Sequence, residues 1–225
     1  MDTTRTQAEQ DYLKAIFDLS EGGGHVTTSR LARHLGLSPA SVTGMLQRLA
    51  SDTPPLVTYR KHHGAALSPE GETEALRVVR HHRLIESFLH RTLGLGWDAV
   101  HAEAHRLEHA ISPAVEDLLS ASLGEPTRDP HGDPIPDRDL HLPVSTDTPL
   151  SQLMPGETAI IRRIGDSDPA FLRHVAALGL LPGVSLHVVD ASAFDHVLRV
   201  RVSGQVDPLV VGLAISDRLL VEAEA

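Results

Sequence analysis

The apolar residues of the first seventy positions follow a helical period and then a strand period. A helix over residues 7–19 is followed by a shorter one that Thr28 caps and Gly36 ends. The next helix begins at Ser38-Pro39, and its apolar residues recur at i, i+3, i+4 and i+7. Three helices followed by a hairpin predict a winged helix-turn-helix, in which the strands cover residues 56–60 and 65–67 and the turn covers 61–64.

Beyond residue 70 the helical period continues and then gives way to short apolar runs. Three further helices are predicted, at 70–93, 98–111 and 112–124. Residues 125–147 are rich in Pro, Asp and Gly, a composition typical of a linker with little regular structure. The runs after residue 150 predict a small β-barrel of about five strands, with strands at 158–164, 184–189, 197–202 and 209–215 and a helix near 169–178.

These elements describe a mainly α protein with a β C-terminal domain. The predicted domains are a winged helix-turn-helix at 1–70, a helical domain at 71–140, a linker at 141–150 and a β-barrel at 151–225. The composition, 41% apolar and 22% charged, is typical of globular proteins, and the chain has neither an apolar run of bilayer length nor a secretory signal at its start. We therefore expect a cytoplasmic protein without a membrane partner.

The charge is unevenly distributed along the chain. The net charge is −10, yet residues 28–61 hold five basic residues against one acidic residue, Asp52. Local charge makes phosphate contacts, so this segment suits double-stranded DNA, whereas the acidic middle of the chain suits cations. Aromatic residues make up only 3% of the chain, which argues against a base-stacking surface for single-stranded nucleic acid.

The helix that begins at Ser38 offers a polar face opposite its apolar stripe. Short polar side chains and an arginine on such a face can read base edges in the major groove, while the turn of the hairpin lies along the backbone. Gly44 lowers helix stability by roughly 1 kcal/mol relative to Ala, which a close approach of the backbone to DNA explains. A dimerisation module with a solvated polar face is the alternative. The predicted DNA contacts are Arg30, Ser38, Pro39, Ala40, Ser41, Thr43, Gly44, Gln47, Arg48, Arg60 and Lys61.

Six of the 15 histidines lie between positions 81 and 109. His82 and Glu86 share one helix face because they are four residues apart, and the next helix carries ligand-type residues at 0, +4, +7 and +8. Two such faces make a metal site, and a chain without cysteine must build it from nitrogen and oxygen donors. A solvated polar seam is the alternative. The residues on the second face are His101, His105, Glu108 and His109.

Two other functions fit parts of this pattern. A metallohydrolase could hold zinc with His82, Glu86, His101 and His105, but the sequence offers no recognisable substrate site. The segment His101-Ala-Glu-Ala-His105 also places its glutamate one position too late for a zinc-protease helix. The other alternative is a winged-helix regulator with structural histidines and a different effector. We therefore expect a regulator and not an enzyme, with no small-molecule substrate.

The motifs "DYLKAI", "LSPASVTGMLQRL", "LSPEG", "HHRLIESFL", "VHAEAHRLEHAIS" and "GDPIP" occur in this order over residues 6–140. In content and spacing they resemble the diphtheria toxin repressor family, the iron- and manganese-dependent repressors that include the manganese transport regulators. The segments "LGLLPG" and "AISDRLLV" resemble the FeoA-like C-terminal domain of the longer members. The resemblance implies a repressor of manganese or iron homeostasis that binds a palindromic operator as a homodimer.

The resemblance also implies two metal sites. The primary site consists of Asp11, His105, Glu108 and His109. The ancillary site consists of His82, Glu86 and His101, completed from the barrel by Asp168, with Asp166 and His174 as alternatives.

Three positions depart from the family's branches. His105 stands where the iron branch has cysteine and the short manganese branch has glutamate. Asp11 replaces the methionine of the iron branch and resembles the manganese branch. Lys14 stands where the short manganese regulators carry a glutamate ligand, so a two-metal cluster of their type is not expected. The hard oxygen donors favour Mn(II) first and Fe(II) second, while the histidines also accept Zn(II), Co(II) or Ni(II) in vitro. For the dimer interface we predict Leu84, Phe88, Leu89, Leu93 and Trp97, which intradomain packing would explain equally well.

Overall fold

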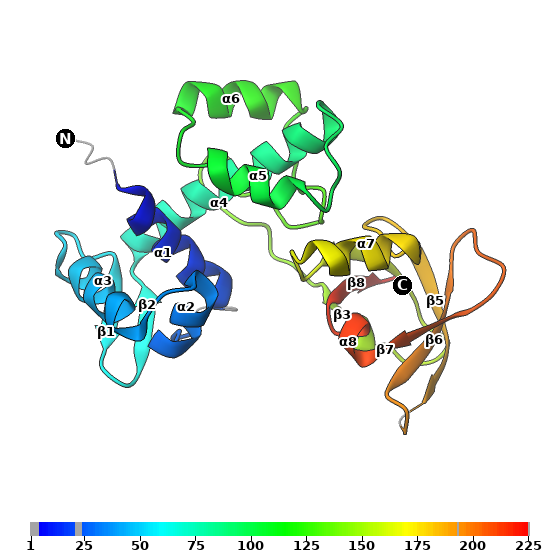
Figure 1. The fold of residues 1–225 in the computed structure, drawn as a ribbon. Helices are drawn as coiled ribbons and strands as arrows, with labels where there is room; N and C mark the ends of the chain where they lie inside the picture. Colours follow the sequence, from blue (N-terminus) through cyan, green and yellow to red (C-terminus); the bar gives the residue numbers. More distant parts are fainter. Residues whose placement is uncertain (1–4, 21–23, 193, 225) are drawn as a thin grey trace. The chain divides into compact units, whose positions relative to one another are not determined.

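The structure, a computed structural model, describes residues 5–20, 24–192 and 194–224 (Figure 1). The chain divides into two compact units. The first unit contains residues 1–82, 107–113 and 136–141, and the second contains 83–106, 114–135 and 142–225.

The first unit contains the predicted winged helix-turn-helix. Its helices are α1 (Gln7–Leu19), α2 (Thr28–Leu35) and α3 (Pro39–Ser51). A capping box starts α1, because the Thr6 hydroxyl accepts from the Glu9 N–H while the Glu9 carboxylate accepts from the Thr6 N–H. The N-cap of α2 is Thr27 and not Thr28 as predicted, since the Thr27 hydroxyl accepts from the Arg30 N–H. Ser38 caps α3 as predicted.

The hairpin of this unit pairs β1 (Val57–Arg60) with β2 (Gly64–Leu67) in antiparallel register, Val57 opposite Leu67. Val26, just before α2, forms an isolated bridge with Ala65 and so ties the helices to the hairpin. The core beneath them is apolar and fully enclosed. Its largest side chains are Leu13, Ile16, Leu31, Leu46, Leu49 and Leu56.

Helix α4 (Pro69–Arg91) begins in the first unit and continues into the second. It is followed by α5 (Val100–Leu107) and α6 (Pro113–Ser122). Helix α5 ends four residues earlier than the predicted end at residue 111, and residues 108–110 form a turn.

The second unit contains a six-stranded antiparallel sheet in the order β3-β8-β4-β5-β6-β7 (Figure 1). Helix α7 (Pro169–Ala177) packs Leu172 and Val175 against the core of the sheet. The predicted strand at 209–215 is wrong in its second half, because Gly212 is the N-cap of the short helix α8 (Leu213–Ser216). The strands are β3 (Thr148–Pro149), β4 (Thr158–Ile164), β5 (Ser185–Ser192), β6 (Val197–Val202), β7 (Leu209–Gly212) and β8 (Leu219–Ala223), and the 3-10 helix η1 covers Leu150–Gln152.

The segment 125–147 has little regular structure, as predicted, but its middle is not a linker. Asp129, His131 and Ile135 are buried. Gly132 lies so close to β4 that a Cβ atom there would be 1.9 Å from the Arg162 carbonyl oxygen, and the Ile164 N–H donates to the His131 carbonyl. The middle of the loop is therefore part of the packed interior of the second unit, whereas residues 137–139, 141 and 143–146 are exposed.

Two residues of the predicted dimer interface are internal. Leu84 is fully buried, and Trp97 packs against the sheet core, whereas Leu93 on the same stretch is exposed.

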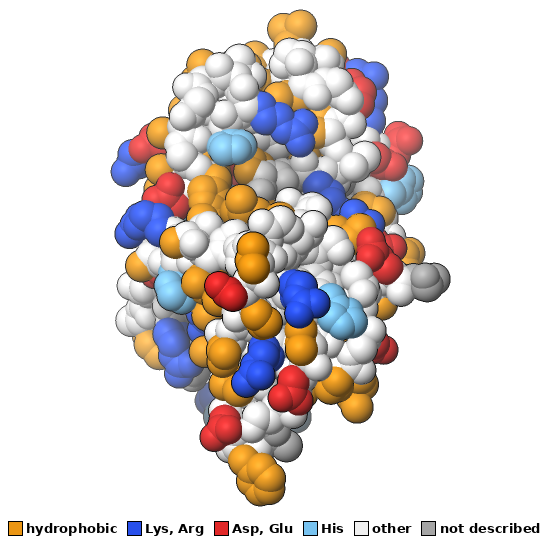
Figure 2. Space-filling model, turned by 90° about the vertical axis from the view of Figure 1, so that its right-hand side faces the viewer, with side chains coloured by type: hydrophobic (Ala, Val, Ile, Leu, Met, Phe, Trp, Pro, Cys, Tyr) orange, Lys and Arg blue, Asp and Glu red, His pale blue; other side chains and the backbone are white. Residues whose placement is uncertain are grey.

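On the face drawn in Figure 2, basic and acidic side chains are interspersed with apolar ones. Among the described residues, no helix combines the length and the apolar character that a membrane crossing requires.

Candidate metal centres and DNA-binding surface

The first cluster of ligand-type residues joins α1 to the turn that follows α5. Asp11 lies on α1, and Glu108 and His109 lie in the turn. Each of the three offers a donor atom within 4.8 Å of the others. Asp11 Oδ1 and His109 Nε2 lie 2.8 Å apart, and both atoms are buried. Their geometry is not that of a hydrogen bond.

The proton on the His109 ring explains why these two atoms fit a cation. His109 Nδ1 lies 2.6 Å from Gln10 Oε1, which can only accept, so the N–H of the ring is at Nδ1. In the neutral ring, Nε2 presents its lone pair to the Asp11 carboxylate, and the two atoms at 2.8 Å need a proton or a metal ion between them. Adjacent ligands of one divalent ion lie about 3 Å apart when each bond is about 2.1 Å. The donor set therefore fits a small divalent metal ion.

Glu108 divides its two carboxylate oxygens between different partners. Oε1 lies 3.4 Å from His109 Nε2, on the Asp11 side. Oε2 accepts from Lys14 Nζ at 2.7 Å and is hydrogen-bonded to His82 Nδ1. The Glu108 side chain is fully buried, and the Lys14 side chain is 12% exposed. His81 Nδ1 lies 3.1 Å from the Glu108 carbonyl oxygen and also holds this turn in place.

These partners keep Glu108 ionised. Burial raises the pKa of the Glu108 carboxyl, but the hydrogen bond from His82 and the positive charge of Lys14 outweigh it and lower the pKa to about 2. An ionised carboxylate is the form that binds metal.

His105 and His82 are the two other predicted ligands near this cluster. His105 is exposed on the last turn of α5, four residues before His109. His82 was predicted for the ancillary site, but its Nδ1 is bonded to Glu108. The roles of both as metal ligands stay predictions.

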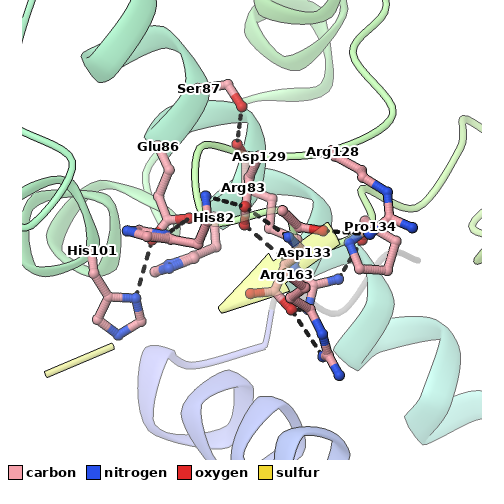
Figure 3. Close-up of polar contacts among 12 residues, drawn as sticks. His82, Arg83, Glu86, Ser87, His101, Arg128, Asp129, Asp133, Pro134 and Arg163 are labelled. Atoms are coloured by element: carbon pink, nitrogen blue, oxygen red, sulfur yellow. Dashed lines mark hydrogen bonds and ion pairs between the residues drawn. The ribbon is translucent and has the colours of Figure 1, made fainter. Parts of the chain in front are cut away.

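The second cluster lies in the second unit around Glu86 of α4 (Figure 3). Glu86 Oε1 lies 3.1 Å from His101 Nδ1, and Glu86 Oε2 lies 3.6 Å from His131 Nδ1. Glu86, Asp129 and His131 are all buried and offer donor atoms within 4.8 Å of one another. The structure thus brings Glu86 and His101 together, as predicted, and adds two residues from the supposed linker.

Asp129 and His131 have strongly perturbed ionisation. The His131 Nε2–H donates to the Trp97 carbonyl oxygen at 2.7 Å, so Nδ1 faces the Glu86 carboxylate. Burial lowers the pKa of His131, but Glu86 and Asp129 outweigh it and raise the pKa to about 9. Burial raises the pKa of Asp129 well above its usual value, and the neighbouring carboxylates of Asp133 and Glu86 add to this.

Carboxylates and arginines lie side by side around this cluster. Arg83 Nη2 is 3.7 Å from Asp133 Oδ1 and its Nε is 4.0 Å from Asp129 Oδ2, and Arg163 also binds Asp133 (Figure 3). Buried carboxylates beside a histidine nitrogen suit a second divalent cation, which would displace the proton of His131 when it binds.

The barrel residues suggested for the ancillary site have other partners. The Asp168 carboxylate accepts from the Ala170 and Phe171 N–H groups as the N-cap of α7. Asp166 accepts from Arg218 at 2.6 Å, and His174 is exposed on α7. The ligand role of Asp168 stays a prediction.

Sequence reasoning missed Gln10, Asp129 and His131. The signal for the last two was a histidine two residues after an aspartate in a segment where only turn-forming residues were expected. For Gln10 the sequence offered no signal, because its role depends on a residue 99 positions away.

The surface predicted to bind DNA contains a groove between α2, α3 and the hairpin. Its volume is about 510 Å³. Thr43 and Gln47 of α3 and Lys61 of the hairpin turn line it, as predicted. The other predicted contacts are exposed, Arg48 with an ion pair of 3.0 Å to Glu9. His62 and Gly64 of the predicted turn line it as well. Residues that the sequence did not indicate also line the groove, namely Thr27, Thr28, Ser29 and Tyr59.

Models of three protein families match consecutive parts of the chain. The N-terminal DNA binding domain of iron dependent repressors matches residues 4–65. The metal binding and dimerisation domain of iron dependent repressors matches residues 68–137, and the FeoA domain matches residues 148–223.

Curated proteins and solved structures extend the likeness. The iron-dependent repressor IdeR of Mycobacterium leprae is 39% identical over 125 residues, which are 56% of this chain and 54% of that protein. The match thus spans about half the length of such curated relatives. A manganese-dependent transcriptional repressor solved with manganese is 36% identical with a TM-score of 0.85, covering 95% of this chain and 98% of that one. The IdeR of T. acidophilum is 30% identical with a TM-score of 0.79, covering 98% and 100%.

Proposed function

The chain belongs to the diphtheria toxin repressor family, and from this premise we propose that it is a metal-dependent transcriptional repressor of manganese or iron homeostasis. The observation that carries the proposal is the gathering of ligand-type atoms from Asp11, Glu108 and His109, with Asp11 Oδ1 and His109 Nε2 only 2.8 Å apart. A metal ion bound by these residues ties α1 of the DNA-binding fold to the turn after α5.

The proposed primary site consists of Asp11, Glu108 and His109, with His105 as the fourth ligand. A bound divalent ion would be held by the carboxylates of Asp11 and Glu108 and by the histidine nitrogens. Gln10 holds the His109 ring so that Nε2 presents its lone pair, which is the usual task of a residue behind a metal-bound histidine. Lys14 and His82 orient Glu108 through its other oxygen.

The proposed second site is centred on Glu86, with His101, Asp129 and His131 as further donors. Trp97 fixes the His131 ring through its carbonyl oxygen, as Gln10 does for His109. The earlier prediction of His82 and Asp168 for this site is the competing ligand set. Oxygen-rich donor sets favour Mn(II), with Fe(II) second, and Zn(II), Co(II) and Ni(II) bind in vitro.

The proposed DNA contacts are the groove of about 510 Å³ and the exposed face of α3 around it. Thr43 and Gln47 contact base edges, while Arg30, Arg48, Arg60 and Lys61 contact phosphates. A homodimer places two such surfaces on a palindromic operator. Exposed apolar residues suited to the dimer contact are Leu93, Val115 and Leu118 of the second unit.

The proposed switch follows from where the ligands lie in the chain. Asp11 belongs to the first helix of the DNA-binding fold, whereas Glu108 and His109 belong to the matched metal-binding and dimerisation domain. When Asp11, Glu108 and His109 share one ion, α1 has a fixed position on that domain. Two recognition helices in a dimer then adopt the one spacing that operator half-sites require, so the metal-bound form binds DNA more tightly.

The test is retention of genomic DNA fragments by the metal-stripped protein, with and without Mn(II), Fe(II) or Zn(II). We expect retention only with metal, and the most potent metal at cellular concentrations identifies the effector. His109→Ala should abolish the metal response without unfolding the protein. The matched control is His141→Ala, an exposed histidine with a side chain 77% accessible, which should leave the response unchanged.

Two results would contradict the proposal. If DNA fragments are retained equally without metal, both clusters have only structural roles. If His109→Ala keeps the wild-type metal response, the assignment of the primary site is wrong. The metallohydrolase alternative with a His/Glu zinc site has no support among these findings, because the family consists of DNA-binding transcriptional repressors.

A further inference from the structure

Lys14 lies inside the primary centre and not at its edge. Its ammonium Nζ is 2.7 Å from Glu108 Oε2 and 2.9 Å from His82 Nδ1, so it contacts one residue after α5 and one on α4. The side chain starts on α1, one turn after Asp11. Only 12% of it is exposed, next to a carboxylate that is fully buried. A lysine so placed holds a full positive charge among groups that otherwise ligate metals.

The two oxygens of Glu108 show which space the ammonium takes. Oε1 faces His109 and the Asp11 side, where the proposed ion binds. Oε2 faces His82 and Lys14. A carboxylate can bridge two ions, one at each oxygen, and the ions of two-metal sites lie about 3.5–4 Å apart. In this chain the second of those positions has an ammonium as its cation.

The net charge of the primary centre also limits the number of metal ions that it can hold. Asp11 and Glu108 contribute two negative charges, and Lys14 contributes one positive charge. One divalent ion leaves this group with a small positive charge, whereas two would leave three positive charges in a largely buried space, which is strongly unfavourable.

We propose that Lys14 is a built-in cation that takes the place of a second metal ion between Glu108 and His82 and restricts the primary centre to one ion. This inference rests on the proposed function, since it concerns the same site. It makes Lys14 a residue that determines metal stoichiometry. It also predicts that a further ion binds only when position 14 offers a negatively charged ligand in place of the ammonium.

The test uses Mn(II) as the probe and counts ions by equilibrium dialysis with elemental analysis, together with electron paramagnetic resonance. Two Mn(II) ions bridged by one carboxylate are exchange-coupled, whereas separate ions show the six-line signal of an isolated centre. For the wild-type protein we expect only isolated signals. For Lys14→Glu we expect one more Mn(II) per chain and a coupled spectrum, while Lys14→Arg and Lys14→Met should keep the wild-type count.

The chain offers a matched control in Lys61, which is its only other lysine and lies exposed in the turn of the hairpin. Lys61→Glu makes the same change of charge away from the centre and should add no ion. Lys14→Glu that binds Mn(II) with the wild-type count would overturn the proposal. So would a coupled spectrum in the wild-type protein, a result that does not depend on whether any variant folds. Wild-type protein that binds no Mn(II) at all would instead contradict the proposed function, and with it this inference.

Discussion

At the scale of single residues, the chemistry of both clusters depends on which nitrogen of a histidine carries the proton. Gln10 Oε1 and the Trp97 carbonyl oxygen each accept from one nitrogen of a ring. The other nitrogen of His109 or His131 is thereby directed at a carboxylate, where it can carry a proton or, once that proton is displaced, bind a metal ion. The spacing of the residues shows which helix face carries the histidines. The acceptors Gln10 Oε1 and the Trp97 carbonyl oxygen determine which ring nitrogen carries the proton.

Gln10→Ala tests this directly. Without the Gln10 oxygen, the His109 ring loses the partner that fixes its tautomer and orientation, so Mn(II) affinity at the primary site should fall about 10- to 100-fold. Calorimetric titration of the metal-stripped protein with Mn(II) measures the change. Gln7→Ala is the control, since Gln7 is an exposed residue of the same helix and should leave the affinity unchanged. Equal affinity in both variants would show that Gln10 does not orient the ligand.

Gly44 tests the DNA-binding surface at the same scale. A Cβ atom at this position has no neighbour within 4 Å, so the fold itself does not require glycine in α3. Gly44→Ala should raise the free energy of unfolding by roughly 0.5–1 kcal/mol, because alanine is the better helix former. If the backbone approaches DNA here, operator affinity should nevertheless fall at least about tenfold.

Thermal unfolding and fluorescence anisotropy with labelled operator measure the two effects of Gly44→Ala. Ser51→Ala, at the exposed C-terminal end of α3, is the control for changes on the same helix. A more stable variant that binds operator as well as the wild-type protein would show that DNA does not approach Gly44.

At the scale of elements, local signals predicted the helices well and the ends and strands less well. Helix α1 follows from its apolar stripe, and α3 follows from its cap and its apolar stripe. Helix α5 stops early, because Glu108 turns inward to Lys14 and His82, contacts with residues 94 and 26 positions away. Strand β8 was not predicted, since its partners β3 and β4 precede it by many residues and its own run is short. Tertiary contacts of this kind leave no local pattern.

The candidate site shows the same division. The spacing of the histidines and glutamates placed Glu86 near His101, and the family resemblance placed Asp11 near Glu108 and His109. Asp129 and His131 could not be predicted, because their loop owes its position to close packing against β4 and not to helical or strand periodicity.

Gly132→Ala tests whether that loop builds the second site. Gly132 has a φ of +89°, and a Cβ atom would be 1.9 Å from the Arg162 carbonyl oxygen, so the loop must move away from β4. We expect a loss of stability of more than about 1 kcal/mol and the loss of one bound Mn(II) per chain, with the primary site unchanged. Chemical denaturation and metal counting measure both.

Gly124→Ala is the matched control for Gly132→Ala. Gly124 has a similar φ of +74°, but a Cβ atom there has no neighbour within 4 Å. It should therefore show only the backbone strain, about 1 kcal/mol, and keep every metal ion. If neither variant loses Mn(II), the loop does not take part in metal binding.

At the scale of the whole molecule, a metal switch and an operator are linked by one free energy of coupling. If Mn(II) tightens operator binding by some factor, operator must tighten Mn(II) binding by the same factor, and couplings of this kind are commonly about 5- to 150-fold. We expect the two factors to agree in wild-type protein. Anisotropy at zero and saturating Mn(II) measures the first factor, and Mn(II) titration with and without saturating operator measures the second.

Arg60→Ala, which removes one proposed phosphate contact, should weaken operator binding in both metal states and leave the coupling factor unchanged. His109→Ala should reduce the coupling factor to one. Unequal factors in the wild-type protein would mean that metal acts on a further equilibrium, such as dimerisation, and that the positioning of α1 by a shared ion is not the whole switch.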